Sequence, residues 1–359
     1  MVEHFIVKEL NGQQHDFSLT FHDDVNIFTG KNGCGKTTLL KLLWYMSSGK
    51  LSTAVSEINY KYAELKTDRF FLSIDRTISD NVIISYKTPK VNIKRKVPFQ
   101  QFIERPFRII EFIDLYSDIE RNGTPTIFFP TFRRIEGGFD NKIENHFRSP
   151  ISNLKEALVE MSNALSTEKH KFISSISTDD LVSLVTKEYT KISEDTNRIQ
   201  KQQSDKIISL IKNRRRTNAD AEELLALIQS DIERMENERQ EKLMPFSILT
   251  DLINRIFHEK GISFVNLALG DIHNIVESDK LSAGEKQMLS FLCYNTFSNG
   301  QIIFIDEPEL SLHPDWQRIL IPTLLNQKNH NQFIIATHSP FIYSKYSDKE
   351  FMLDLDKGF

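Results

Sequence analysis

The residues best suited to do chemistry begin with a glycine-rich loop. Gly30 is followed, after four residues, by Gly35, Lys36 and Thr37, which is the pattern of a phosphate-binding P-loop. Its glycines let successive backbone N–H groups curl around phosphate oxygens at a helix start. We expect Lys36 to reach the β- and γ-phosphates of ATP and Thr37 to bind Mg²⁺. The predicted nucleotide-binding residues of this loop are Gly30, Asn32, Gly33, Cys34, Gly35, Lys36, Thr37 and Thr38.

Two adjacent carboxylates follow an apolar run near the other end of the chain. The run Ile302–Ile305 is typical of a buried strand, and Asp306 and Glu307 come directly after it. Taken alone, the pair is also compatible with a solvated turn. Adjacent acids at the end of a core strand are costly unless a cation shares them. We therefore expect Asp306 to hold the Mg²⁺ shell and Glu307 to orient an attacking water.

A third motif lies at a predicted helix start. Ser282 and Glu285 stand three positions apart before an apolar run, which predicts a capping box. A well-capped helix is the simplest interpretation. The segment Leu281–Gln287 nevertheless resembles the signature motif of the ABC ATPase superfamily. The resemblance implies that Ser282 and Gly284 bind the γ-phosphate of an ATP held by a partner subunit, so that a head-to-tail dimer carries two composite sites.

Two further segments resemble motifs of the same superfamily. Glu309–Pro314 is similar to its D-loop, which implies that Ser311 and His313 lie at a dimer interface. The triplet Thr337-His338-Ser339 resembles its switch histidine. A lone histidine is more often an ordinary surface or core residue. The resemblance instead makes His338 a γ-phosphate sensor, which completes a predicted catalytic set of Lys36, Glu307 and His338.

The spacing of the motifs points to one branch of that superfamily. Lys36 and Ser282 are 246 positions apart, a much longer separation than in transporter subunits. This layout, and Glu285 where transporters usually carry glutamine, resemble the SMC, RecF and OLD group. The segment Phe128–Gly138 resembles compact OLD-like ATPases, including PtuA-type proteins of anti-phage systems. It places Arg133 and Arg134 where a Q-loop glutamine would be expected. We expect them to sense phosphate, with solvated surface charge as the alternative.

Apolar patterning predicts the elements that position these residues. The fold class is α/β, an ABC-type P-loop ATPase head with an antiparallel β-subdomain and an inserted helical hairpin. Strands are expected at Val25–Phe28, Thr126–Phe129 and Phe333–Ile335, with an antiparallel meander over 60–96. We divide the chain into an N-terminal lobe (1–135), a helical insertion (136–245) and a C-terminal lobe (246–359).

The insertion shows apolar residues at helical offsets of three and four. We expect a short antiparallel hairpin, with Pro245 marking the return to the globular body. One stripe comprises Ala221, Leu224, Leu225, Ile228, Ile232 and Met235, and a second comprises Leu154, Leu158, Met161 and Leu165.

Composition limits the classes of protein to consider. The 359 residues are 40% apolar, enough for a sizeable core, and 45 basic against 49 acidic residues disfavour a surface that is basic throughout. Cys34 and Cys293 have no metal-ligand spacing. No signal peptide or stretch of about 20 apolar residues occurs. These features predict a cytoplasmic protein without a membrane partner.

Several partners remain open at this point. The leading hypothesis is a homodimer or higher homo-oligomer that controls a separate effector, a nuclease or toxin, in anti-phage defence; only 21 residues follow His338, which leaves no room for a nuclease domain. The alternative is a DNA-repair or recombination ATPase that clamps DNA through the basic run Lys212–Arg216. A third hypothesis, a scaffold that binds ATP without turnover, is disfavoured by Glu307.

Overall fold

The computed structural model describes residues 1–78, 80–104, 113–131, 160–174, 178–214, 221–257 and 281–354. The chain divides into two compact units, each considered by itself. The sheet unit comprises Met1–Ser175 and Ser298–Phe359, and the hairpin unit comprises Ile176–Phe297. The division predicted from the sequence, with boundaries at 135 and 245, was based on where the motifs lie and not on compactness. It stays a prediction.

A parallel sheet forms the centre of the sheet unit. Its strand order is β12-β3-β11-β10-β8-β9, and every pair is parallel. Four predicted strands therefore lie side by side, and apolar residues along them are buried because both faces are covered. The strands are β3 (Val25–Thr29), β8 (Thr126–Phe129), β9 (His170–Phe172), β10 (Ile302–Asp306), β11 (Gln332–Ala336) and β12 (Glu350–Met352). The sequence analysis found all of these except β9 and β12, which are only three residues long.

An antiparallel sheet forms the second layer, which confirms the predicted meander. Its order is β2-β1-β4-β5-β6-β7, with β7 at one edge. The strands are β1 (Val2–Lys8), β2 (Phe17–Thr20), β4 (Tyr62–Thr67), β5 (Phe71–Asp75), β6 (Asn81–Lys87) and β7 (Asn92–Pro98). One face of this sheet is apolar and buried, while the other alternates with it and carries polar residues.

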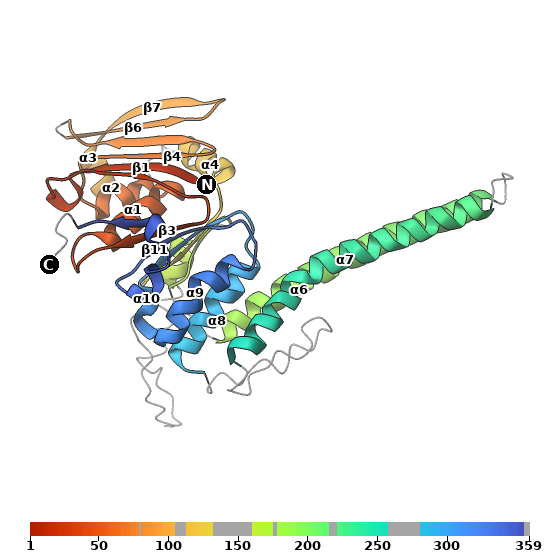
Figure 1. Ribbon diagram of the computed structural model, residues 1–359. Coiled ribbons are helices and arrows are strands. Elements are labelled where there is room, and N and C mark those ends of the chain that lie inside the picture. The colour runs from red at the N-terminus through yellow and green to blue at the C-terminus, as the bar shows by residue number, and fades with distance from the viewer. Residues whose placement is uncertain are drawn as a thin grey trace, which may run out of the picture. The chain divides into compact units, whose positions relative to one another are not determined.

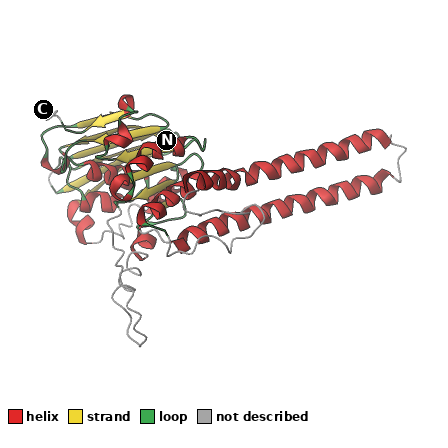
Figure 2. Ribbon diagram, turned by 60° about the horizontal axis from the view of Figure 1, so that its bottom comes forward, coloured by secondary structure: helices red, strands yellow, loops and turns green. Residues whose placement is uncertain are grey.

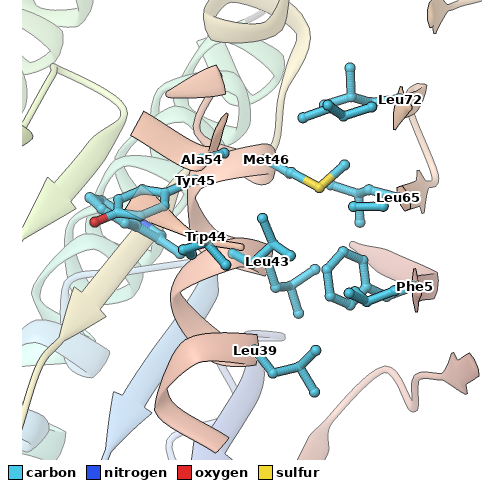
Figure 3. Close-up of a cluster of buried hydrophobic side chains, with 14 of the residues drawn as sticks. Phe5, Leu39, Leu43, Trp44, Tyr45, Met46, Ala54, Leu65 and Leu72 are labelled. Carbon is cyan, nitrogen blue, oxygen red and sulfur yellow. The ribbon is translucent and has the colours of Figure 1, made fainter. Parts of the chain in front are cut away.

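Helix α1 (Lys36–Ser47) packs on the buried face of this sheet. Leu39, Leu43 and Met46 point toward Phe5 and Leu65, as Figure 3 shows. On its other side, Trp44 lies 5.1 Å from Phe128 of β8, measured between ring centroids. A helix that is apolar all round must be covered on all sides. The same helix therefore carries the P-loop at its N-terminus and joins the two sheets (Figure 1).

Shorter helices complete the sheet unit. They are α2 (Leu51–Glu57), α3 (Phe99–Glu104), α4 (Ile113–Asn122), α9 (Pro314–Leu325) and α10 (Pro340–Tyr343), with 3-10 turns η1 (Leu10–Gly12), η7 (Pro308–Ser311) and η8 (Ser347–Lys349). Of the second predicted stripe, Met161 and Leu165 lie in a short helical stretch, whereas Leu154 and Leu158 fall outside the described residues.

The hairpin unit consists of two long helices and a shorter one. Helices α6 (Thr178–Arg214) and α7 (Ala221–Phe257) run side by side in opposite directions (Figures 1 and 2), which confirms an antiparallel hairpin, but the prediction that it is short was wrong. Each has 37 residues, a length of about 55 Å. The helix α8 (Ala283–Thr296) packs against both. None of the described helices is both long and apolar enough to cross a membrane.

The expected end of the hairpin at Pro245 was wrong. Pro245 lies inside α7, which continues to Phe257. The proline lacks one backbone donor, yet the apolar stripe passes through it. Phe246 is fully buried, with its ring 5.6 Å from Tyr189 of α6 and 5.0 Å from Phe297. Packing around Phe246 thus holds the helix together where its local propensity is weakest.

Candidate active site

The predicted P-loop connects β3 to α1 and has the backbone of an anion cradle. Gly30 has φ +139°, and a Cβ added there would lie 2.8 Å from Cys34 Sγ. Gly35 precedes the helix with φ +99°. No side chain caps α1, so the N–H groups of its first turn, which have no partner within the helix, can donate to a ligand. Such a helix N-terminus favours a phosphate group. Asn32 is exposed on this loop, and Thr38 lies partly buried in the first turn.

Lys36 is held over the loop that precedes it. Its Nζ donates to the Gly30 carbonyl at 2.9 Å and to the Lys31 carbonyl at 3.0 Å. The residue is only 5% exposed, so its charge is compensated by backbone oxygens rather than by water. Its Nζ also lies 3.5 Å from His338 Nδ1. The structure therefore brings together two predicted site residues that are 302 positions apart in the sequence.

Asp306 is the centre of a second cluster. Its Oδ1 accepts from Thr37 Oγ1 at 2.9 Å, and its Oδ2 accepts from Thr131 Oγ1 at 2.6 Å. Burial raises the pKa of the Asp306 carboxyl, the hydrogen bonds from Thr131 and Thr37 lower it, and the nearby charge of Glu307 raises it. Both oxygens of this carboxylate, which is only 2% exposed, thus accept hydrogen bonds from hydroxyl groups, and these bonds fix its orientation.

Thr131 was not found by sequence reasoning. The signal was present in the strand order: Phe129 of β8 pairs in register with Ile305 of β10, so the residues after both strands meet at one sheet edge. Thr131 comes two residues after the end of β8, and Asp306 is the last residue of β10, so the two side chains meet at this edge. It occupies the place near the end of β8 where a Q-loop glutamine had been sought.

Glu307 and His338 face each other at the same edge. Glu307 adopts the left-handed conformation, φ 48° and ψ 57°, and its N–H donates to the Ala336 carbonyl at 2.8 Å. A non-glycine residue in this region is strained and must be held by its surroundings. Its Oε1 lies 3.8 Å from His338 Nε2, and both side chains are partly exposed, 22% and 32% respectively. The carboxylate can therefore contact both solvent and the histidine.

Glu309 positions the backbone around the histidine, a role that the sequence analysis did not foresee. Its carboxylate accepts from His338 N at 2.6 Å and from Thr337 Oγ1 at 2.8 Å. Gln317 of α9 donates to the Glu309 carbonyl at 3.3 Å, and its Oε1 accepts from Ser339 Oγ at 2.5 Å. These bonds connect the turn η7, helix α9 and the segment after β11 into one network.

The two predicted interface residues lie between η7 and α9, next to this network. Ser311 ends η7, and His313 caps α9 by accepting from Asp315 N at 3.4 Å. The neighbouring Leu310 is 52% exposed. The structure thus presents this turn at the surface of the sheet unit.

The predicted signature residues belong to the hairpin unit. Ser282 Oγ accepts from Glu285 N at 3.3 Å, and Glu285 Oε2 accepts from Ser282 N at 2.6 Å. This reciprocal pair is the predicted capping box at the start of α8. Gly284 is buried in the first turn.

Two groups of predicted residues cannot be compared with the fold in full. Arg133 and Arg134 lie outside the described residues. Of the basic run, 212–214 form the end of α6, while Arg215 and Arg216 fall outside the described part.

The cluster around Asp306 fits a magnesium ion that is also bound by a nucleotide. Mg²⁺ prefers oxygen ligands and is commonly held by one or two carboxylates together with phosphates and water. Asp306 and Thr37 offer these oxygens at the start of the helix that follows the phosphate cradle. Within the described residues there is no group of three or more His, Cys, Asp or Glu side chains that would hold a metal by themselves. The site is therefore suited to a metal that arrives with phosphate.

Comparison with known proteins agrees with this chemistry. A family model described as an AAA ATPase domain matches residues 1–343. The chain is 24% identical to "Retron Vc95 probable ATPase" of Vibrio cholerae over 94% of its own length and 70% of that protein. It is 23% identical to "Endonuclease GajA" of Bacillus cereus, over 95% of this chain but only 55% of that protein. A Pyrococcus furiosus Smc head domain, solved with an extended coiled coil and bound to the C-terminal domain of ScpA, aligns over 96% of this chain with a TM-score of 0.38 and 14% identity.

Proposed function

Because the chain belongs to the AAA ATPase domain family, we propose that it binds Mg²⁺-ATP at the carboxyl edge of its parallel sheet and hydrolyses it. The observation that supports this most directly is the convergence at that edge. Lys36, Asp306 and His338 come from three separate segments and meet through contacts of 3.5 Å or less with P-loop, Thr37 or Thr131 atoms. The family therefore indicates that the ligand is ATP, and the geometry indicates the role of each side chain.

Each side chain has a distinct role in this proposal. Lys36 exchanges its two carbonyl contacts for the β- and γ-phosphates, which neutralises charge as the terminal phosphoryl group leaves. Asp306 and Thr37 would hold Mg²⁺, which would polarise the phosphate oxygens when bound. Glu307 orients the attacking water and accepts its proton. His338, fixed by Glu309, contacts the γ-phosphate.

We further propose that the working form is a homodimer with two composite sites. Ser282 and Gly284 of one subunit would then complete the site at the P-loop of the other. Support comes from the resemblance of Leu281–Gln287 to the signature motif and from the exposed turn carrying Leu310 and Ser311.

The biological role proposed for this ATPase is control of a separate effector, a nuclease or toxin, in anti-phage defence. The similarity to a retron ATPase and to an endonuclease supports it. The alignment with the endonuclease spans about half of that protein, so its nuclease activity is not transferred to this chain.

A Glu307→Gln substitution tests the ATPase proposal. It keeps the size of the side chain and removes the base, so turnover should fall by roughly 100-fold or more while ATP binding persists. The trapped ATP should shift the protein from monomer to dimer in light scattering with Mg²⁺-ATP, whereas wild type should return to monomer as ATP is consumed. A Glu307→Gln protein that hydrolyses ATP at the wild-type rate would contradict the assignment of the base.

The effector proposal has a separate test. Tagged wild type and Glu307→Gln protein are purified in parallel from the native host and analysed by mass spectrometry. A nuclease or toxin-like chain enriched in one nucleotide state is the expected result. Recovery of DNA without any protein partner would contradict the effector proposal and favour a DNA clamp.

A further inference from the structure

The edge of the antiparallel sheet formed by β6 and β7 carries a concentration of positive charge that the ATPase proposal does not use. Positions 81–98, which form β6, β7 and their turn, contain five basic residues and no acidic one. The whole chain, in contrast, has a net charge of −4. We call these five residues the basic strip: Lys87, Lys90, Lys94, Arg95 and Lys96.

All five side chains of the basic strip are exposed. In the part of the chain that the structure describes, none of them forms an ion pair with a carboxylate. The nearest acid by register is Asp75, whose Oδ1 accepts from Thr77 N at 2.9 Å and from Thr77 Oγ1 at 2.6 Å. The charge of the basic strip is therefore available to an external anion.

The register arranges three of these cations on one face. Lys94 pairs with Ser85 and Lys96 pairs with Ile83 of β6, and Lys87 lies two positions beyond Ser85. Residues two apart on a strand point the same way, about 7 Å from each other. Lys87, Lys94 and Lys96 thus form a row of charges on two adjacent strands, at the edge of the sheet shown in Figure 1.

An aromatic side chain adjoins this row. Phe71 of β5 pairs directly with Lys87 of β6, and on its other side with Lys66 of β4. Its neighbour Leu72 points to the buried face (Figure 3), whereas Phe71 is partly exposed on the opposite one. Directly paired side chains lie roughly 5 Å apart at Cβ. The face therefore offers an aromatic ring in register with Lys87 on one side, while Lys66 on the other side is ion-paired with Glu3 at 2.7 Å.

Protection of the sheet edge explains only part of this arrangement. Lysines on an edge strand discourage pairing with another sheet, which would account for Lys94 and Lys96 on β7. Lys87 lies on the interior strand β6, and Phe71 lies one strand further in. An apolar ring exposed among cations would weaken such protection. A ligand with both negative charge and flat apolar surface fits these residues better.

We propose that this face binds single-stranded nucleic acid, with phosphates on Lys87, Lys94 and Lys96 and an unpaired base stacked on Phe71. Proteins that bind single strands combine a positive surface along the backbone with aromatic rings for the bases. Phosphate contacts alone would serve a duplex equally well. Phe71 distinguishes the single strand, because the bases of a duplex are not free to stack on it.

The test measures binding of a fluorescein-labelled single-stranded DNA of mixed sequence to the full chain by fluorescence anisotropy across a salt series. The triple variant Lys87→Gln/Lys94→Gln/Lys96→Gln should bind at least about tenfold more weakly, and its slope of log affinity against log salt should fall by about 2. The matched control removes three exposed lysines from α6, as Lys187→Gln/Lys191→Gln/Lys201→Gln, and should retain affinity and slope.

Phe71→Ala separates stacking from charge. It should weaken binding about tenfold without changing the salt slope. Phe341→Ala, which removes another partly exposed aromatic ring, is its control and should have no effect. RNA of the same sequence shows which nucleic acid is preferred. All the lysine and Phe71 variants should keep the wild-type ATPase rate and melting temperature, which excludes misfolding as the cause.

Three outcomes would overturn the proposal. Equal losses in the two triple variants would mean that net charge alone determines binding. Tighter binding of duplex, together with an unaffected Phe71→Ala protein, would assign the strip to duplex backbone. Unchanged affinity in the basic-strip variant, with aggregation instead, would leave edge protection as the function of these lysines.

Discussion

Predicted phosphate-binding residues lie both at the carboxyl edge of the parallel sheet, here called the catalytic edge, and at the start of α8 in the hairpin unit. The two places differ in the contacts that hold these residues. At the sheet edge, Asp306 and His338 are held by atoms from distant parts of the chain, and Lys36 lies 3.5 Å from His338 in addition to its contacts with the loop. At α8, the side chain of Ser282 is engaged with Glu285 only three positions away. The arrangement at the sheet edge depends on tertiary structure, and the arrangement at α8 on a single helix turn.

This difference indicates where regulation can act. Tertiary contacts hold the catalytic edge in place before any ligand binds, so its affinity for nucleotide belongs to the folded sheet unit. In the proposed dimer, in contrast, the Ser282 hydroxyl would meet a phosphate only when another subunit brings one. Substitutions at the two places should therefore have different kinds of effect, on nucleotide binding by one chain and on assembly of two.

Lys36→Ala should have the largest effect on a single chain. It removes the cation that contacts two phosphates, and charge-assisted hydrogen bonds contribute about 1.5–3 kcal/mol each, so ATP affinity should fall by roughly 100-fold or more. Isothermal titration calorimetry with ATP measures the loss. Lys31→Ala is the control, because it removes an exposed charge from the same loop. Equal losses in both variants would show that loop charge, and not the position of Lys36, holds the nucleotide.

Thr131→Val should have an intermediate effect at the same edge. It leaves one oxygen of the buried Asp306 carboxylate without its 2.6 Å donor, and the Mg²⁺ concentration needed for half-maximal activity should rise about tenfold. The Thr131 hydrogen bond lowers the pKa of Asp306. Its removal raises that pKa, so the loss of activity on acidification should begin at higher pH. Thr131→Ser keeps the hydroxyl and should restore both properties.

The role of Thr131 also shows which features could be predicted from the sequence and which could not. Local patterns were enough for β3, β8, β10 and the capping box at Ser282, because each depends on neighbours in sequence. Thr131 and Glu309 act through residues 175 and 29 positions away, and only the strand order brings them into contact. The extension of α7 past Pro245 was missed for the same reason, since tertiary burial of Phe246 outweighs the local cost of a proline.

Substitutions of Ser282 should have the smallest effect on a single chain. They test most directly whether the start of α8 acts together with the catalytic edge of another subunit. Ser282→Ala removes the cap of α8 and should lower the free energy of unfolding by about 1 kcal/mol, measured by urea titration without nucleotide. Ser282→Asp keeps a capping acceptor, so its stability should stay near wild type. Its carboxylate would nevertheless repel a γ-phosphate, and in a Glu307→Gln background it should abolish the dimer formed with ATP. If the Ser282→Asp protein still dimerises with ATP, Ser282 is only a helix cap, and the two halves of the site are not joined through it.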